Sequence, residues 1–401
     1  MNSQMKLLFF TEARLEQTED GRFYSADHSF SYQLFKRYLS IFDKVLVVAR
    51  VFLVAQRQQP FDESTRVDNS GVAVLPLPYY IGPYQYLIMK NKLHDSLHRY
   101  IDLHPDAAVI CRVPGVIGAI AVKYLTKKNR PYGLEIVGDP IDVFAPGSFN
   151  HPFRAVFRYS GTRDLKRVVK GAVATIYVTK NFLQSRYPPG ENAYSTYASD
   201  VILRSDAFAV HPKVMKNQPP YLLISVGSLS AMYKSPDVAI KAIARLKKRG
   251  MDLSLRWIGG GKHIKEMKEL AHRTGVGDNV CFIGNVGSPS EIIRHLDESD
   301  LFVIPSRTEG LPRALVEAMA RGLPCIGSSI GGIPELLDKT ALVPLNQPQL
   351  LANKIYEFLT NSNLADLQAD RNLKHARNYE YDLLEAKRIE FYKYLKVYRT
   401  V

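Results

Sequence analysis

Cysteine is rare in this sequence, whose 401 residues include only Cys111, Cys281 and Cys325. Three cysteines this far apart form neither a disulfide framework nor the close spacing of a metal site. We therefore expect no disulfide bonds and no bound metal, which fits a protein of the reducing cytoplasm.

Long apolar runs are missing as well. The two longest, residues 45–55 and 107–122, are interrupted by Arg50 and by Arg112 with Pro114. Neither supplies the roughly 20 uninterrupted apolar residues of a membrane-spanning helix. The apolar stretch that follows Lys6 has only four residues, too few for the core of a secretion signal. The sequence thus predicts neither a membrane span nor export.

Acidic residues are fewer than basic ones, 39 against 53, which leaves a net charge of +14. This excess favours a negatively charged partner, and nucleic acid, anionic lipid and phosphorylated small molecules are the candidates. The positive charge is spread over both halves of the chain, and no nucleic-acid recognition motif appears, so we expect no nucleic-acid partner.

Short apolar runs alternate with helix-length segments in two separate stretches of the chain, which predicts parallel strands joined by crossover helices. Residues 209–220, AVHPKVMKNQPP, are rich in proline and polar residues, as expected of a linker. We predict an α/β fold with domains over residues 1–208 and 221–378 and a terminal helix within residues 379–401. The expected strands cover residues 6–10, 45–48, 72–75, 107–111, 134–137, 174–178, 221–226, 253–258, 280–283, 301–304 and 324–327.

The segment after the expected strand 301–304 carries the strongest chemical signal. A turn containing Glu309 and Gly310 precedes a helix that we expect to begin near Pro312 or Arg313, since proline favours the first turn of a helix. This point lies at the carboxyl end of a strand, where α/β sheets bind ligands, and free amides at a helix start favour a phosphate. Gly310 lets the backbone approach a ligand closely.

Glu317 lies about one turn into the same helix, so its side chain can point back toward the crevice that Glu309 borders. Carboxylates suit paired sugar hydroxyls because each accepts two strong hydrogen bonds. Alternatively, Glu317 only pairs with Arg313 at i, i+4 spacing, a contribution of about 0.2–0.5 kcal/mol.

Glu309 and Glu317 are separated by seven residues, with PS ahead of them, EAMARGLP across the second and GGIPEL after it. In these motifs the sequence resembles the GT4 family of GT-B glycosyltransferases. The resemblance implies two Rossmann-like domains facing a central cleft, with the terminal helix crossing back to the first. It also implies sugar transfer from a nucleotide-diphosphate sugar with retention of configuration and without an obligatory metal or other cofactor.

The resemblance also implies roles for individual residues. Glu309 would contact the transferred sugar, and Glu317 would bind the ribose hydroxyls. The backbone between them would hold the diphosphate, at Gly310, Leu311, Pro312 and Arg313.

The segment VGSLSAMYKSPD resembles the family's second diphosphate site, where an arginine follows the glycine and a lysine comes six residues later. Lys234 matches the lysine, whereas Ser228 replaces the arginine. A serine can donate a hydrogen bond to a phosphate but cannot neutralise it, so we hypothesise that Arg313 supplies part of the missing charge. The alternative for Lys234 is a solvated surface lysine.

Two further segments resemble loops that the family places near the nucleotide. WIGGGK would bring Gly260 to the phosphates, although its spacing is not that of a Walker P-loop. CFIGNV would bring the backbone of Val286 to the base. Either segment could instead be a turn or part of the core.

Three residues of the first domain are candidates for the acceptor side, each with an alternative. Gly21, in DGRFYS, either allows a close approach or forms a surface turn. Asp139, in GLEIVGDP, stands where many family members have a histidine and either acts at the reacting centre or caps the next segment as an Asp-Pro turn. Arg112 either binds an anionic acceptor or forms an ion pair.

Residues 151–171 are strongly basic, with apolar residues interspersed, as in helices that lie on anionic membranes. This pattern suits an acceptor linked to a polyprenyl diphosphate, which the resemblance also suggests. The alternative is a solvated helix that packs its apolar side on the sheet.

The resemblance implies a hexosyltransferase-type enzyme of cell-surface polysaccharide biosynthesis, acting on a glycan or a lipid-linked glycan. Two alternatives share the fold. One is a nucleotide-sugar 2-epimerase, for which no convincing set of acid and base carboxylates is found. The other is a non-catalytic subunit that binds sugar nucleotides, which the replacement of an arginine by Ser228 would suit.

Overall fold

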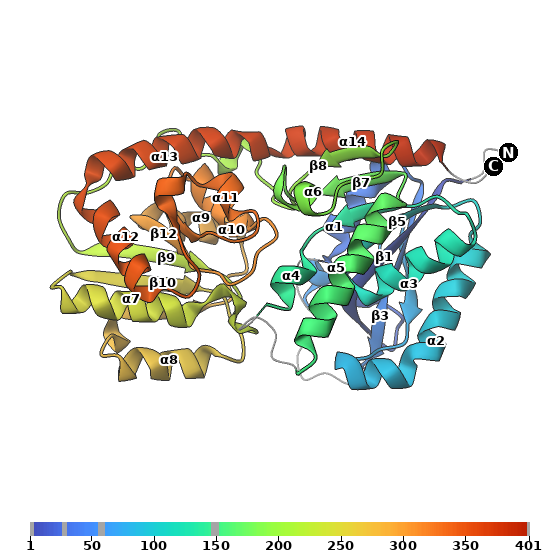
Figure 1. The fold of residues 1–401 in the computed structure, drawn as a ribbon, viewed down its shortest axis with the longest axis horizontal. Helices are drawn as coiled ribbons and strands as arrows, with labels where there is room; N and C mark the ends of the chain where they lie inside the picture. The colour runs from blue at the N-terminus through green and yellow to red at the C-terminus, as the bar shows by residue number, and fades with distance from the viewer. Residues whose placement is uncertain (1–3, 26–29, 55–60, 146–151, 399–401) are drawn as a thin grey trace.

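The computed structural model describes residues 4–25, 30–54, 61–145 and 152–398. Its described part contains two β-sheets, one after the other along the chain, and helices pack on each sheet (Figure 1). No helix within these ranges has both the length and the apolar character needed to cross a bilayer.

The first sheet has the strand order β4-β3-β1-β5-β6-β7-β8, and its neighbouring strands run parallel. A short strand, β2, pairs antiparallel with the end of β1. The strands are β1 (Lys6–Gln17), β2 (Phe23–Ser25), β3 (Lys44–Leu53), β4 (Val72–Leu77), β5 (Ala108–Val113), β6 (Gly133–Ile136), β7 (Ala174–Tyr177) and β8 (Tyr194–Tyr197). The helices are α1 (Tyr32–Lys36), α2 (Gly82–Leu103), α3 (Val116–Lys127), α4 (Pro140–Val143), α5 (Arg154–Lys170) and α6 (Phe182–Arg186).

The second sheet is parallel throughout its described strands and has the order β11-β10-β9-β12-β13-β14. Its strands are β9 (Tyr221–Val226), β10 (Leu253–Ile258), β11 (Val280–Gly284), β12 (Leu301–Ile304), β13 (Cys325–Ser328) and β14 (Leu342–Val343). The helices are α7 (Pro236–Lys248), α8 (Ile264–Arg273), α9 (Pro289–Glu298), α10 (Arg313–Ala320), α11 (Ile333–Leu336), α12 (Pro348–Thr360), α13 (Ser362–Ala376) and α14 (Tyr381–Val397). Short 3₁₀ turns are η2 (Arg37–Ser40), η3 (Glu63–Thr65), η4 (Ser205–Ala207), η5 (Met232–Lys234), η6 (Gly277–Asn279), η7 (Lys339–Ala341) and η8 (Arg377–Tyr379).

In both sheets the strand order reverses beside the first strand, as in Rossmann folds, so the predicted α/β class with two Rossmann-like domains is confirmed. Several strands differ from the expectation. The first strand runs on to Gln17 rather than ending at Phe10, and the chain then turns back as β2. The edge strands β8 and β14 were not predicted, because β8 is half-exposed and β14 has only two residues.

The terminal helix α14 leaves the second domain and packs on the first, which confirms the predicted crossing (Figure 1). Its first amide, that of Tyr381, donates to the carbonyl of Leu203 at 2.8 Å. Farther along, Arg388 donates to the carbonyl of Ser199, and the ring of Tyr392 lies 4.9 Å from that of Tyr38. Tyr38 and Tyr392 are fully buried, so α14 is part of the first domain's core.

Residues 209–220 run along the second domain. The amide of Ala209 donates to the carbonyl of Ala320 at 2.8 Å, and the amide of Lys213 donates to that of Gly322 at 2.9 Å. Met215 is buried, and its amide donates to the Asp366 carboxylate. This segment therefore stays attached to the domain that follows it.

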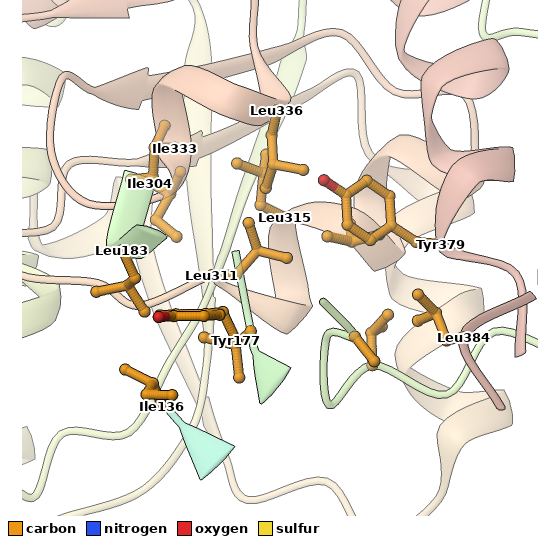
Figure 2. Close-up of a cluster of buried hydrophobic side chains, with 14 of the residues drawn as sticks. Ile136, Tyr177, Leu183, Ile304, Leu311, Leu315, Ile333, Leu336, Tyr379 and Leu384 are labelled. Atoms are coloured by element: carbon orange, nitrogen blue, oxygen red, sulfur yellow. The ribbon is translucent and has the colours of Figure 1, made fainter. Parts of the chain in front are cut away.

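A buried apolar cluster joins the two domains (Figure 2). Tyr177 and Leu183 of the first domain lie near Leu311 and Ile333 of the second, and all four side chains are buried. The domains thus share part of one hydrophobic core, which burial from water stabilises.

Candidate functional site

The reversal of strand order in the second sheet brings two loops together. The loop after β9 ends in η5, which carries Lys234, and the loop after β12 carries Glu309. The ammonium of Lys234 donates to Oε1 of Glu309 at 2.6 Å, and their side chains are only 13% and 7% exposed. Crevices at such reversals are where open α/β sheets bind ligands.

This contact changes the protonation of the lysine. Burial disfavours the charged form of Lys234, but the Glu309 carboxylate more than offsets the effect, so the pKa of Lys234 lies above its ordinary value. The lysine is therefore a fixed positive charge, already paired with a carboxylate, rather than the solvated surface residue of the alternative interpretation.

Two serines hold the glutamate. The hydroxyl of Ser306 donates to Oε1 of Glu309 at 2.6 Å, and the hydroxyl of Ser328, on β13, donates to the carbonyl of Ser306 at 2.5 Å. Ser306 and Ser328 are both buried. The Glu309 carboxylate is thus oriented from the neighbouring strand as well as by the lysine.

Arg307 connects the glutamate loop to the lysine loop. Its guanidinium donates to both carboxylate oxygens of Asp237 at 2.9 and 2.8 Å and to the carbonyl of Met232 at 3.0 Å. Its own amide donates to the carbonyl of Tyr233 at 2.7 Å. These bonds flank Lys234 on both sides, so Arg307 fixes the position of the lysine relative to Glu309.

The expected helix start is present. Helix α10 begins at Arg313 with Pro312 as N-cap, and no side chain caps its first amides. Glu317 is half-buried, and burial raises its pKa above the ordinary value while the nearby charge of Arg313 lowers it. The charge of Arg313 also acts on Lys234, where it lowers the pKa. Lys234, Arg313 and Glu317 therefore lie within electrostatic reach of one another around the helix start.

Gly310 and Gly331 are glycines because other backbones approach them closely. A Cβ on Gly310 would lie 2.5 Å from the carbonyl oxygen of Val137 in the first domain. Gly331 has φ +56°, and a Cβ there would lie 2.0 Å from the carbonyl oxygen of Glu309. The Glu309–Gly310 turn is thus enclosed between the GGIPE segment and the first domain.

The other predicted donor-side residues lie on adjoining loops. Ser228 is exposed, and its hydroxyl contacts the carbonyl of Gly260 at 3.4 Å. The amide of Gly260 donates to the Asn285 side chain at 2.6 Å, which connects the loop to the one that carries Val286. Leu311 and Pro312 are buried in the turn between Gly310 and α10. The loops that follow β9, β10 and β11 therefore form one continuous rim.

Asp139 lies near the loop that carries Glu309 and Gly310, but its carboxylate binds groups of the first domain. The residue follows Val137, which lies against Gly310, yet its side chain is fully enclosed. Its carboxylate caps α4 by accepting from the amide of Ile141 at 2.8 Å, and it also accepts from Arg186 and from the Tyr187 hydroxyl. The structure shows the contacts of the capping interpretation, and a catalytic role for Asp139 stays a prediction.

Arg112 and Gly21 likewise have structural roles. Arg112 belongs to a buried network in which its guanidinium pairs with Glu135 at 2.9 Å and with Asp200. Gly21, at φ +83°, is an exposed residue of the turn between β1 and β2, with no atom within 4 Å of the position a Cβ would take. Both residues therefore have the contacts that their alternative interpretations expect, and acceptor-side roles for Arg112 and Gly21 stay predictions.

Sequence reasoning missed Ser306, Arg307 and Glu335, although PS and GGIPEL were recognised as context for the glutamate pair. The partners of Arg307 and Glu335 lie 39 to 155 residues away along the chain. Only the run of polar residues just before Glu309 could have pointed to Ser306.

Comparison with known proteins supplies independent findings. Residues 206–375 match the model of the family described as glycosyl transferases group 1. Protein CapJ of Staphylococcus aureus is 29% identical over 391 residues, which cover 96% of this chain and 94% of CapJ. A putative colanic acid biosynthesis glycosyltransferase, WcaL of Salmonella typhimurium, is 35% identical over 157 residues, 37% of this chain and 38% of WcaL.

Among solved structures, Anabaena HepE in complex with UDP and glucose superposes with a TM-score of 0.66 at 15% identity. The match covers 96% of this chain and 98% of HepE. At this identity the likeness concerns the fold.

Proposed function

We propose that this chain, whose residues 206–375 match the family of glycosyl transferases group 1, moves a sugar from a nucleotide-diphosphate donor to a hydroxyl of a glycan or lipid-linked glycan. The similarity to WcaL, described as a putative colanic acid biosynthesis glycosyltransferase, supports a place in bacterial cell-surface polysaccharide biosynthesis, such as capsule, exopolysaccharide or O-antigen assembly. The observation that carries the proposal is the Lys234–Glu309 pair beside the uncapped start of α10.

The positive groups of the crevice suit the leaving diphosphate. Lys234 and Arg313 would pair with its oxygens, and the first amides of α10 would donate to it. Glu317 would accept from the ribose hydroxyls. Glu309, released from Lys234 by the phosphate, would accept from a hydroxyl of the transferred sugar. The main contributions of the protein would be charge stabilisation and positioning.

We further propose that transfer retains the configuration and requires no metal. The acceptor oxygen would attack the anomeric carbon on the face from which the diphosphate departs, and a phosphate oxygen would take the acceptor proton. The bond from the anomeric carbon to the phosphate oxygen breaks as the new glycosidic bond forms. In this scheme Lys234 and Arg313 supply the positive charge that a metal would otherwise provide.

Two alternative functions remain open to test. A 2-epimerase would convert the donor in the absence of any acceptor, and a non-catalytic subunit would bind the donor without turnover. The glycosyltransferase relatives and the paired Lys234 and Glu309 favour transfer over both.

A thermal-shift screen of UDP, GDP, ADP and their sugars tests the proposal. The correct nucleotide should raise the melting temperature, because a ligand that binds only the folded state stabilises it by mass action. The Glu317→Ala variant should lose most of this rise, whereas Glu357→Ala, which removes an exposed carboxylate that pairs with Lys354, should keep it. If no nucleotide shifts the wild type, the proposal is wrong.

We also propose that the enzyme contacts the inner face of the plasma membrane through α5. The second half of α5 packs Leu165, Val168 and Val169 on the domain, as the solvated alternative predicts, but its start differs. There Val156 and Tyr159 are 60% and 72% exposed, and Figure 1 shows this end of α5 at the same lower edge as the start of α2. The predicted basic segment begins at His151, which lies outside the described residues.

Exposed cations accompany these apolar residues along α5, including Arg158, Arg163 and Lys166. Their charge would attract anionic headgroups, and the apolar side chains would enter the interface. Flotation with anionic liposomes at low salt should carry the protein upward, and Val156→Glu should weaken this, whereas Leu367→Glu on α13 should not. Leu367 is equally exposed, at 63%, but lies in the other domain. Absence of wild-type flotation would refute the contact.

A further inference from the structure

Glu335, in the GGIPE segment of the second domain, binds the first domain. Its carboxylate accepts hydrogen bonds from three consecutive backbone amides there, those of Lys180 at 2.7 Å, Asn181 at 2.9 Å and Phe182. These amides form the start of α6, where helix amides lack partners within the helix. A carboxylate is a strong acceptor for such amides because the bonds are charge-assisted.

The same segment contacts the loop that carries Glu309 and Gly310. The amide of Gly332 donates to the carbonyl of Gly310 at 2.7 Å, and Gly331 lies against the carbonyl of Glu309. Glu335, which binds α6, is therefore only a few residues away from Gly331 and Gly332, which enclose Glu309. The first domain completes this enclosure, since the carbonyl of Val137 lies against Gly310.

An apolar contact also joins the domains. Leu183 of α6 lies near Ile304 and Ile333 in the cluster of Figure 2, and all three side chains are buried. Apolar burial is non-directional, whereas hydrogen bonds to fixed amides are directional. The hydrogen bonds of Glu335 therefore constrain the orientation of the first domain more sharply than the apolar cluster does.

We propose that Glu335 is a positioning residue. It fixes the first domain, on the acceptor side, over the loop that carries Glu309 and Gly310. The consequence for catalysis rests on the proposed function, whereas the placement of the first domain by Glu335 rests on the contacts alone. By accepting from α6 while its own segment holds the Glu309–Gly310 turn, Glu335 couples the placement of the acceptor side to that of the sugar-binding glutamate.

Hydrogen exchange of the full-length protein tests this coupling. In Glu335→Ala, amide exchange should rise about tenfold not only at residues 180–186 but also at residues 134–139 and 308–312, where no hydrogen bond was removed directly. The radius of gyration from small-angle scattering should increase by about 1 Å or more as the domains reorient.

Two variants serve as comparisons. Glu335→Gln keeps an oxygen that can accept from Asn181 and Phe182 but turns an amide group toward the amide of Lys180, so its exchange and scattering should be intermediate. Glu357→Ala, on α12, should match the wild type.

Exchange that rises only at residues 180–186, with an unchanged radius of gyration, would show that Glu335 merely caps α6 and would overturn the proposal. If the wild type binds no nucleotide, the proposed function fails, and the exchange and scattering data still decide whether Glu335 positions the domain.

Discussion

Replacing Glu309 with glutamine should tighten the binding of a nucleoside diphosphate while it removes sugar transfer. The Lys234 ammonium donates to Glu309 at 2.6 Å in a site where both side chains are largely buried. A diphosphate that binds Lys234 must compete with this carboxylate. It must also come close to the negative charge of Glu309.

The size of the effect follows from the hydrogen bond that is exchanged. A hydrogen bond to a charged group contributes roughly 1.5–3 kcal/mol, and a neutral acceptor gives about half as much. Glutamine still accepts from Ser306 and from Lys234, so about 0.7–1.5 kcal/mol of competition disappears. Since about 1.4 kcal/mol is tenfold in affinity, the dissociation constant should fall roughly three- to tenfold.

Isothermal titration calorimetry with UDP and GDP measures the change directly. Lys234→Met is the matched partner, because it removes the cation while keeping a flexible unbranched side chain of similar size, and it should weaken binding. The transfer rate of Glu309→Gln should fall steeply, since a neutral amide cannot replace the carboxylate toward the sugar. A folded Glu309→Gln protein that binds the nucleotide no more tightly than the wild type would refute the competition.

Three further predictions concern burial and positioning. Burial, and then the charge of Asp139, raise the pKa of Asp142 to about 6, against the opposing charges of Arg186 and Arg158, so its carboxylate destabilises the fold above that pH. Asp142→Asn should therefore raise the free energy of unfolding by roughly 1–3 kcal/mol at pH 8 and leave it unchanged near pH 3.5, as urea unfolding at the two pH values will test. Glu317→Gln should raise the melting temperature at pH 8, because burial also raises the pKa of Glu317, yet weaken nucleotide binding in the same thermal-shift assay; a lower melting temperature would contradict this. Ser306→Ala should lower kcat several-fold with little change in nucleotide affinity, measured by kinetics and calorimetry, and an unchanged kcat would show that the serine does not orient Glu309.

The second sheet was largely predictable from the sequence because parallel strands buried on both faces read as continuous apolar runs. The observed bounds Tyr221–Val226, Leu253–Ile258 and Leu301–Ile304 match those expected. The edge strands β8 and β14 escaped prediction, since a half-exposed or two-residue strand has no such run.

The site was predictable only where a local motif carries the chemistry. Glu309 and Lys234 could be recognised from the residues around them, and the structure brings them together. Arg307 and Glu335 act on partners distant in sequence, so local spacing gave no signal. For Asp139, a catalytic and a capping role share the same local sequence, and only the burial and partners of the carboxylate distinguish them.

The return of α14 to the first domain has a mechanical consequence. The chain passes between the domains twice, and the two passages lie side by side, because Leu203 before the first accepts a hydrogen bond from Tyr381 after the second. Two neighbouring covalent connections allow the domains to rotate about the line that joins the connections. They resist twisting of one domain against the other and separation of the domains. Cutting the chain within residues 209–220 alone would leave the two domains joined through α14. Removing α14 would remove the second connection and also expose the buried ring of Tyr38 to solvent.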